Sequence, residues 1–304
     1  MTLASNQSVG SPRSTPKRVL ILGATGMVGR SWIELLKADK ISYRAVSRPE
    51  FDLMDPSTIS ACITDEYDLV VNAAAWTDVD GAESDEIGAT RANGEAIAEI
   101  AQLCKNIDAT LITYSTDYVF SGDGTSPYLP DAPIDPINAY GRSKLVGEQI
   151  LSDSDSSHIL IRTSWVYAPW GKNFVLTIWN LAQSRDELQV VNDQQGRPTS
   201  AQQLAQNSLS LYTNGAQGVW HLSDDGECTW FDLATQIAKL SNPDCKVSPC
   251  SSDQYPRPAV RPAYSTLDIA QSIPLIGSLN RWQENVSAVC QALSNTGTQA
   301  PTAN

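Results

Sequence analysis

The sequence predicts an α/β protein built on a doubly wound parallel sheet of the Rossmann type. Short, continuous apolar segments alternate with segments whose apolar residues recur at helical spacing, the pattern of buried parallel strands joined by helices. A glycine-rich turn lies between the first strand and the first helix. With 304 residues, of which 41% are hydrophobic, the chain can bury the core of one large domain or of two unequal ones.

The individual elements follow from these patterns in chain order. The first strand is expected at 17–22 and the first helix at 31–38. Four later strand candidates are short runs rich in β-branched and other apolar residues, at 43–47, 68–75, 109–115 and 158–167. Further helices with one apolar face are expected at 94–105, 138–151 and 281–293.

Composition separates two regions of the chain. Proline, glycine and tryptophan become more frequent after about residue 168. We therefore expect a dinucleotide-binding domain over 17–168 and, over 169–304, mainly a smaller, interleaved substrate-binding region. The segments 187–191 and 218–222 keep the pattern of strands and are expected to be added to the first sheet.

Charge and composition exclude several classes of function. With 34 acidic and 21 basic residues the formal net charge is −13, which argues against a nucleic-acid-binding protein. No apolar run approaches the roughly 18 to 20 residues that span a membrane. Residues 1–16, rich in Ser, Thr and Pro, lack the apolar centre of a signal peptide and are expected to form a flexible tail. Six cysteines without C-x-x-C spacing favour a cytoplasmic protein.

The turn GATGMVG (23–29) indicates a nucleotide site because a strand precedes it and a helix follows. Gly23 permits the tight turn, Gly26 lets the backbone approach a pyrophosphate, and Gly29 lets the helix pack close to the strand. The amides at the start of the helix would hold the phosphates. An ordinary loop is the alternative, since the spacing is G-x-x-G-x-x-G rather than G-x-G-x-x-G.

Tyr140 and Lys144 are four residues apart in a predicted helix, so both side chains project from one face. A phenol with its usual pKa of about 10 is a poor acid at neutral pH, and a nearby ammonium group lowers that pKa. The pair indicates proton transfer at a carbonyl or alcohol oxygen, although a surface Tyr and Lys show the same spacing. Thr116 follows the strand candidate 109–115, where ligands of doubly wound sheets bind, and is positioned to donate a hydrogen bond to a substrate oxygen.

These segments together resemble the extended short-chain dehydrogenase/reductases and, within them, the dTDP-4-dehydrorhamnose reductase family. The resemblance covers residues 17 to about 293. It is carried by eight motifs in order: GATGMVG (23–29), VNAAAWTDVDGAES (71–84), STDYVFSG (115–122), NAYGRSKLVGE (138–148), RTSWVY (162–167), DQQGRPTSA (193–201), HLSDDGECTWFDLA (221–234) and RPAVRPAYSTLD (257–268).

The resemblance implies that Thr116, Tyr140 and Lys144 form the catalytic set. Their reaction would be reduction of the C4 keto group of dTDP-4-dehydro-6-deoxy-L-mannose, giving dTDP-L-rhamnose. Tyr140 would protonate the developing alkoxide, Lys144 would hold the nicotinamide ribose and lower the pKa of Tyr140, and Thr116 would polarise the carbonyl. The residues expected to contact the dTDP-sugar are Asp117, Tyr118, Trp165, Lys172, Arg197, Arg257 and Arg261, the last four as cations for its diphosphate.

Arg48 follows the second strand candidate, where it can pair with an adenosine 2′-phosphate, so NADPH is the favoured cofactor. NADH stays an alternative because Glu50 or Asp52 can fold back to a ribose hydroxyl. The expected cofactor contacts are Gly23, Thr25, Gly26, Met27, Val28, Gly29, Arg48, Asp52, Leu53, Ala73, Ala74, Ala75, Asn93, Tyr140 and Lys144.

Several alternatives remain open at this level. Tyr118 stands where related dehydratases place an acidic residue, which disfavours dehydration, whereas epimerisation uses the same Tyr/Lys pair. Reduction of another nucleotide 4-keto-6-deoxy sugar is an alternative, as is a non-catalytic subunit resembling the regulatory β subunit of methionine adenosyltransferase. The resemblance also implies a homodimer and Mg²⁺ dependence, but the sequence offers no complete set of carboxylate ligands for a metal.

Overall fold

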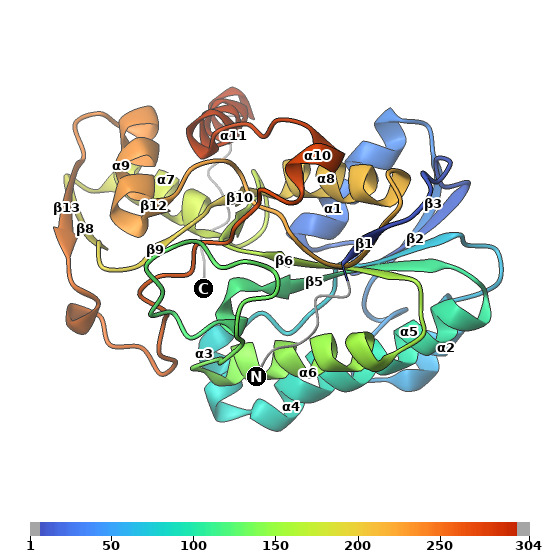
Figure 1. Ribbon diagram of the computed structural model, residues 1–304. Coiled ribbons are helices and arrows are strands. Elements are labelled where there is room, and N and C mark those ends of the chain that lie inside the picture. The colour runs from blue at the N-terminus through green and yellow to red at the C-terminus, as the bar shows by residue number, and fades with distance from the viewer. Residues whose placement is uncertain (1–6, 297–304) are drawn as a thin grey trace.

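The computed structural model describes residues 7–296, and its largest sheet confirms the doubly wound α/β class (Figure 1). Within the described residues this sheet has the order β1-β11-β6-β5-β4-β2-β3, and every neighbouring pair is parallel except β1 with β11. Its strands are β1 (Ser8–Val9), β2 (Arg18–Leu22), β3 (Ser42–Val46), β4 (Leu69–Asn72), β5 (Thr110–Thr116), β6 (His158–Thr163) and β11 (Ala216–His221).

Helices cover both faces of this sheet because its central strands are apolar on both faces. Leu20 and Leu22 of β2 pack into the core under α2 (Pro56–Cys62), α5 (Ala96–Asn106) and α6 (Ala139–Asp153). Val19 and Ile21 pack into the opposite core with α1 (Met27–Ala38) and α8 (Ala201–Thr213). Figure 1 shows these two helical layers below and above the strands. The alternation along β2 is the period of two that places successive side chains on opposite faces.

The remaining elements belong to two groups. Between β4 and α5 lie α3 (Val79–Ser84), α4 (Glu86–Thr90) and a π-helical segment (Arg91–Glu95). After β6 the chain forms a second core centred on Val175, Leu233 and Val286. The elements of this region are β7 (Val166–Tyr167), α7 (Phe174–Ser184), β8 (Glu187–Val191), β9 (Gln195–Gly196), β10 (Thr199–Ser200), β12 (Cys228–Thr229), α9 (Trp230–Ser241), β13 (Lys246–Cys250) and α11 (Trp282–Thr296). Helix α10 (Ile273–Ile276) instead packs with α8 against the core of the first sheet.

Only one of the two segments expected to extend the first sheet does so. Strand β11 does join it, beside β6. Strand β8 instead pairs in parallel with β13 in a separate two-stranded sheet, contrary to expectation. The reason is visible in its burial: Leu188 and Val190 are buried, whereas Glu187 and Gln189 are exposed. Such one-sided burial suits a strand with helices on one face only, and α7 and α9 provide that cover.

Part of the expected N-terminal tail has defined structure. Ser8 and Val9 form the antiparallel edge strand β1 on β11, and Arg13 donates hydrogen bonds to the carbonyl oxygens of Tyr212 and Ala216, each at 3.1 Å. These contacts satisfy backbone groups that the edge of β11 would otherwise expose. The rest of the expected tail, residues 1–6, lies outside the described residues.

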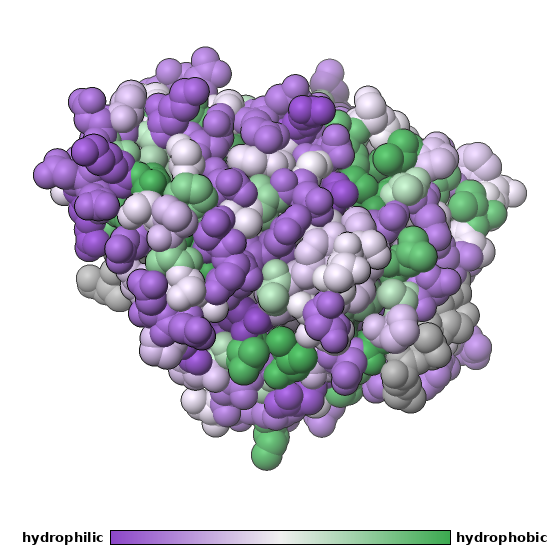
Figure 2. Space-filling view, turned by 60° about the vertical axis from the view of Figure 1, so that its left-hand side comes forward, coloured by the Kyte–Doolittle hydropathy of each residue, from purple (hydrophilic) through white to green (hydrophobic). Residues whose placement is uncertain are grey.

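Among the described helices, none combines the length and apolarity needed to cross a membrane. On the face shown in Figure 2, hydrophobic residues form small, separate groups among hydrophilic ones. That face therefore lacks the broad apolar surface that often marks a permanent interface.

Candidate active site

The glycine turn brings β2, α1 and the segment after β4 into close contact. Gly23 has φ of +87°, and a Cβ atom there would lie 2.7 Å from the backbone nitrogen of Ala74. At Gly29 a Cβ atom would lie 2.2 Å from the carbonyl oxygen of Gly23. Helix α1 begins at Met27, directly after Gly26 and four residues before its expected start. Its N-terminus therefore faces the turn, as a pyrophosphate site requires.

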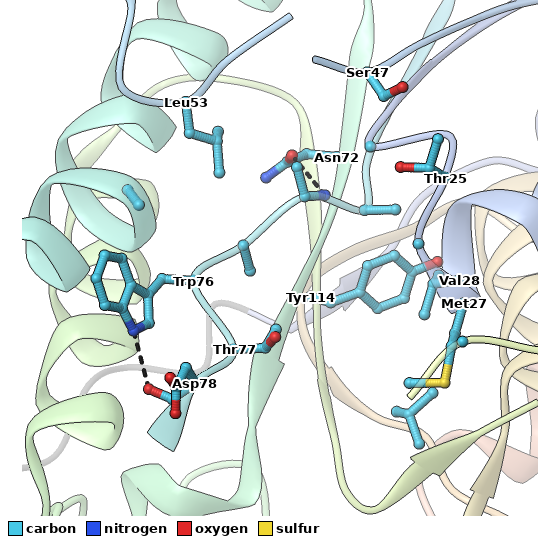
Figure 3. Close-up of a pocket in the computed structure, with 18 of the residues that line it drawn as sticks. Thr25, Met27, Val28, Ser47, Leu53, Asn72, Trp76, Thr77, Asp78 and Tyr114 are labelled. Carbon is cyan, nitrogen blue, oxygen red and sulfur yellow. Dashed lines mark hydrogen bonds between the residues drawn. The ribbon is translucent and has the colours of Figure 1, made fainter. Parts of the chain in front are cut away.

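A cavity of about 1000 Å³ opens at the carboxyl ends of β2, β4, β5 and β6. This volume is at the upper end of the range of about 300–1,000 Å³ for ligand sites. In Figure 3, Leu53 and Trp76 lie on one side of it and Thr25, Met27 and Val28 on the other. The expected cofactor residues that line it are Gly23, Thr25, Gly26, Met27, Val28, Arg48, Asp52, Leu53, Ala73, Ala74, Ala75, Tyr140 and Lys144.

Two expected cofactor residues support the cavity without lining it. Gly29 packs behind the glycine turn. Asn93 accepts a hydrogen bond from the backbone of Trp76 at 2.9 Å and donates from Nδ2 to the Trp76 carbonyl and to Ser143 Oγ. It thereby fixes the segment after β4 against α6, the helix that carries Tyr140.

The catalytic candidates come together at the edge of this cavity. Tyr140 and Lys144 line it from α6, whose N-cap Asn138 accepts a hydrogen bond from the Gly141 backbone at 2.8 Å. Thr116 ends β5, and its side chain lies close enough to Tyr140 to act on the pKa of the phenol. Lys144 Nζ donates to the carbonyl oxygen of Tyr114 at 2.7 Å.

The pKa of Tyr140 is raised, not lowered as the sequence suggested. Burial removes the hydration of the phenolate, the Asp117 charge opposes its formation, and the Thr116 hydrogen bond only partly offsets both. The Lys144 ammonium is directed to a backbone carbonyl, and burial lowers its own pKa to about 8 while the Glu148 charge opposes this shift. Tyr140 is a protonated phenol at neutral pH, as an ordinary phenol is, and the raised pKa makes it a weaker proton donor.

Helix α6 is tied to the sheet by a buried ion pair. Glu148 accepts hydrogen bonds from Arg162 Nη2 at 2.7 Å and Nε at 3.0 Å, and both side chains are only 1% exposed. Ser115 donates to the same carboxylate, and Arg162 Nη1 donates to the carbonyl oxygen of Pro130 at 2.8 Å. One turn beyond Lys144, the pair joins α6 to β6, and Ser115 joins it to β5.

Two of the expected sugar contacts, Tyr118 and Asp117, lie close to Tyr140. Tyr118 meets the Tyr140 ring edge to face, with centroids 6.0 Å apart. Asp117 is buried, accepts a hydrogen bond from Thr116 Oγ1 at 3.0 Å, and has its pKa raised to about 6 by burial. Trp165 has φ of +47° and stacks on Trp230 with centroids 3.5 Å apart.

The four expected diphosphate cations do not form one cluster. Lys172 lines the cofactor cavity. Arg197 lies 3.7 Å from Asp225, with its side chain 13% exposed. Arg257 and Arg261 both bind Asp80 of α3, at 2.7 Å each. The four side chains therefore lie at three places: Lys172 at the cofactor cavity, Arg197 beside Asp225, and Arg257 together with Arg261 at Asp80.

Several cavity residues were not expected. Directly after Ala75, the cavity is lined by Trp76, Thr77 and Asp78. The nearby end of β4 could have indicated these residues, because ligands bind at the carboxyl ends of such strands. Tyr114 lines it from within β5, where an apolar run gave no signal. The other lining residues outside the expected cofactor set are Ser47, Phe51, Met54, Asn72, Ala92, Ser115, Thr163, Val166 and Gly171. Within residues 7–296, no group of three His, Cys, Asp or Glu side chains is arranged to hold a metal ion.

Comparison with known sequences matches the chain along most of its length. A family model described as RmlD substrate binding domain matches residues 17–295. The dTDP-4-dehydrorhamnose reductase of Burkholderia thailandensis is 37% identical over 270 residues, which cover 82% of this chain and 90% of that protein. The dTDP-4-keto-6-deoxy-D-glucose reductase of Streptomyces niveus is 38% identical over 254 residues, covering 82% of this chain and 88% of that protein.

A solved structure also matches the fold over most of the length of this chain. A crystal structure of dTDP-4-dehydrorhamnose reductase from Bacillus anthracis in complex with NADP superposes with a TM-score of 0.85. The two chains are 31% identical, and the match covers 91% of this chain and 99% of the other.

Proposed function

The chain belongs to the RmlD substrate binding domain family, and we propose that it reduces the C4 keto group of dTDP-4-dehydro-6-deoxy-L-mannose to give dTDP-L-rhamnose. It is an NAD(P)H-dependent oxidoreductase of the dTDP-4-dehydrorhamnose reductase type. The observation that carries the proposal is the position of Tyr140 and Lys144 on the wall of a dinucleotide-sized cavity, with Thr116 close to Tyr140.

The cavity fits a nicotinamide dinucleotide. Side chains are absent where Gly23 and Gly26 let the backbone approach a pyrophosphate, and the N-terminus of α1 faces the same point. Arg48 on the cavity wall supports NADPH over NADH, as does the NADP complex of the Bacillus anthracis protein. When bound, the reduced cofactor supplies the hydride for the substrate carbonyl.

Side chains of the protein would supply the proton for the reduction. As the C4 carbonyl becomes an alkoxide, Tyr140 would donate its phenolic proton to that oxygen. Thr116 would polarise the same carbonyl by turning its hydroxyl from Asp117 to the substrate oxygen. Lys144 would hold the nicotinamide ribose. Asp117, Tyr118 and Trp165 shape the sugar site, while Arg197, Arg257 and Arg261 contribute positive charge for the diphosphate. Lys172 lies by the cofactor cavity, so we assign it to that side.

The Mg²⁺ implied by the sequence resemblance does not fit the described residues, because they contain no group of three His, Cys, Asp or Glu side chains that could hold it. A cytoplasmic location is supported by the six buried free cysteines. A homodimer is the proposed assembly.

One other sugar is a specific second candidate. The Streptomyces niveus relative acts, by its name, on dTDP-4-keto-6-deoxy-D-glucose, and its identity of 38% is no lower than that of the rhamnose-pathway relative. Both candidates share the C4 keto group and differ in the stereochemistry of the ring.

The decisive assay follows NADPH absorbance with each of the two sugars. We expect one NADPH consumed per dTDP-L-rhamnose formed, with the product configuration assigned by NMR. Faster turnover of the D-glucose derivative would replace the first candidate by the second. Tight NADPH binding without turnover of either sugar would favour the non-catalytic subunit.

A further inference from the structure

Asp80 of α3 holds two arginines of a distant loop at once. Its Oδ2 accepts hydrogen bonds from Arg257 Nε at 3.0 Å and Nη2 at 2.7 Å. Its Oδ1 accepts from Arg261 Nη1 at 2.7 Å and from the Ala259 backbone at 3.2 Å. One carboxylate thus binds the side chains of Arg257 and Arg261 and the backbone of Ala259.

The same loop lies over the catalytic helix. Asn138, the N-cap of α6, donates from Nδ2 to the Val260 carbonyl at 2.9 Å. Burial raises the pKa of Tyr118, and the nearby charges that also act on it include Asp117, Arg261 and Asp80. Arg261 therefore lies within electrostatic reach of the residues around Tyr140.

Helix α3 connects this loop to the cofactor cavity. The cavity-lining segment ends at Asp78, the N-cap of α3, two residues before Asp80. On the same helix, Glu83 accepts a hydrogen bond from the Ala139 backbone at 2.8 Å, next to Tyr140. Helix α3 thus contacts the arginine loop, the start of α6 and the cofactor cavity.

The bonds to Asp80 leave donors for a ligand. Arg261 uses Nη1 for Asp80 and for the Ala259 carbonyl, and within the described residues its Nε and Nη2 make no hydrogen bond. The Arg261 side chain is 18% exposed, so it is held yet reachable. Two guanidinium groups and one carboxylate leave a net positive charge at the cluster, which favours an anion.

We propose that Asp80 is a positioning residue for the substrate diphosphate, holding Arg261 and Arg257 in the orientation in which their free donors meet the phosphate oxygens. The inference rests on the proposed function. Because the arginines are ordered before the substrate arrives, binding does not have to pay the entropy of fixing two long side chains. Burial alone would raise the pKa of Asp80, but hydrogen bonds from Arg261, Ala259 and Arg257 lower it to about 2, so the carboxylate stays ionised at working pH.

The test compares Asp80→Asn with Glu86→Gln. Glu86 makes a similar ion pair with Arg142, at 2.7 Å, on the neighbouring helix α4 and does not contact the loop. We expect Asp80→Asn to raise the Kd for dTDP and the KM for the sugar substrate about tenfold, the effect of losing one charge-assisted hydrogen bond. The kcat and the Kd for NADPH should stay within about twofold, and Glu86→Gln should match the wild type throughout.

Three outcomes would overturn the proposal. Unchanged dTDP affinity would mean that the arginines need no positioning, and tighter dTDP binding would mean that Asp80 competes with the diphosphate. Equal losses for dTDP and NADPH would indicate a general structural role. If Asp80→Asn does not fold, Asp80→Glu keeps the charge, and its dTDP affinity should fall by about threefold while NADPH affinity is retained. A wild-type protein that binds no dTDP would instead refute the proposed function.

Discussion

At the scale of single residues, burial shifts the pKa of both members of the proposed catalytic pair. A reductase needs an acid for the alkoxide, and the Tyr140 phenol, whose pKa is raised, carries its proton at neutral pH. Burial acts in the opposite sense on Lys144 because there the charged form is the protonated one. One environment therefore favours the neutral form of both groups, while Thr116 and Glu148 oppose that tendency.

Replacing Tyr140 by Phe removes the proton donor and keeps the ring. We expect kcat to fall by about 10²-fold or more, because general acid catalysis contributes about that much. The Kd for NADPH, measured by fluorescence titration, should change by less than about twofold. A kcat near that of the wild type would mean that another group protonates the alkoxide.

Lys144 gives the reaction a pH dependence whose direction follows from its pKa of about 8. The ammonium is present below that value and is lost as the pH rises through it. We therefore expect kcat/KM for NADPH, which reports the free enzyme, to fall above about pH 8. Lys144→Met should give a low, flat profile; a wild-type profile that stays flat through this range would contradict the assignment.

At the scale of elements, α6 carries the proposed catalytic residues Tyr140 and Lys144 and is anchored at its N-terminus and again at Glu148. Its N-terminus is fixed by Asn138 and by Glu83 from α3. Farther along, the buried Glu148–Arg162 pair joins it to β6, and Ser115 joins it to β5. A helix held in this way keeps Tyr140 at a fixed distance from the end of β5, where Thr116 lies.

Glu148→Gln should therefore be strongly destabilising. Removing one partner leaves the Arg162 guanidinium buried without a counter-charge, which costs about 3–5 kcal/mol. Urea unfolding followed by circular dichroism measures the loss. The exposed pair of Glu86 and Arg142 supplies the control, because Glu86→Gln should cost less than about 1 kcal/mol. Equal effects would mean that the buried pair does not anchor the helix.

At the scale of the whole molecule, the cavity lies between the two halves of the chain. Gly171 and Lys172 of the C-terminal half line it opposite the glycine turn. Trp170 donates a hydrogen bond to the Met27 carbonyl at 3.4 Å, and the Arg30 guanidinium lies 4.2 Å above the Trp170 ring. Cofactor binding should consequently stabilise both halves together.

The stabilisation provides a test of cofactor choice. At 100 times its Kd a ligand stabilises the folded protein by about 2.7 kcal/mol, so a better-bound cofactor raises Tm more at equal concentration. We expect NADPH to raise Tm more than NADH does, and Arg48→Ala to remove that difference. Thermal denaturation with each cofactor measures it. A preference for NADPH that persists in Arg48→Ala would assign the 2′-phosphate to another cation.

The sequence by itself determined the sheet class and the local chemistry, because both depend on short-range patterns. Continuous apolar runs specify buried strands, and the glycine spacing specifies the turn after β2. Tyr140 and Lys144 share a helix, so their spacing alone places them on one face. Thr116 could be placed because a strand's end is also a local feature.

Only the tertiary structure decided the contacts between distant segments. Nothing near Asp80 in the sequence indicates that it binds Arg257 and Arg261, and nothing in the pattern of β8 shows that β13 is its partner. The pKa of Tyr140 is raised, whereas the sequence predicted that it would be lowered. Burial and the charge of Asp117 cause this rise, and Lys144, four residues away, does not prevent it. Local sequence determines backbone dihedral angles and which side chains share one face of a helix or strand. Burial, and contacts between charges far apart in the sequence, arise only once the chain has packed.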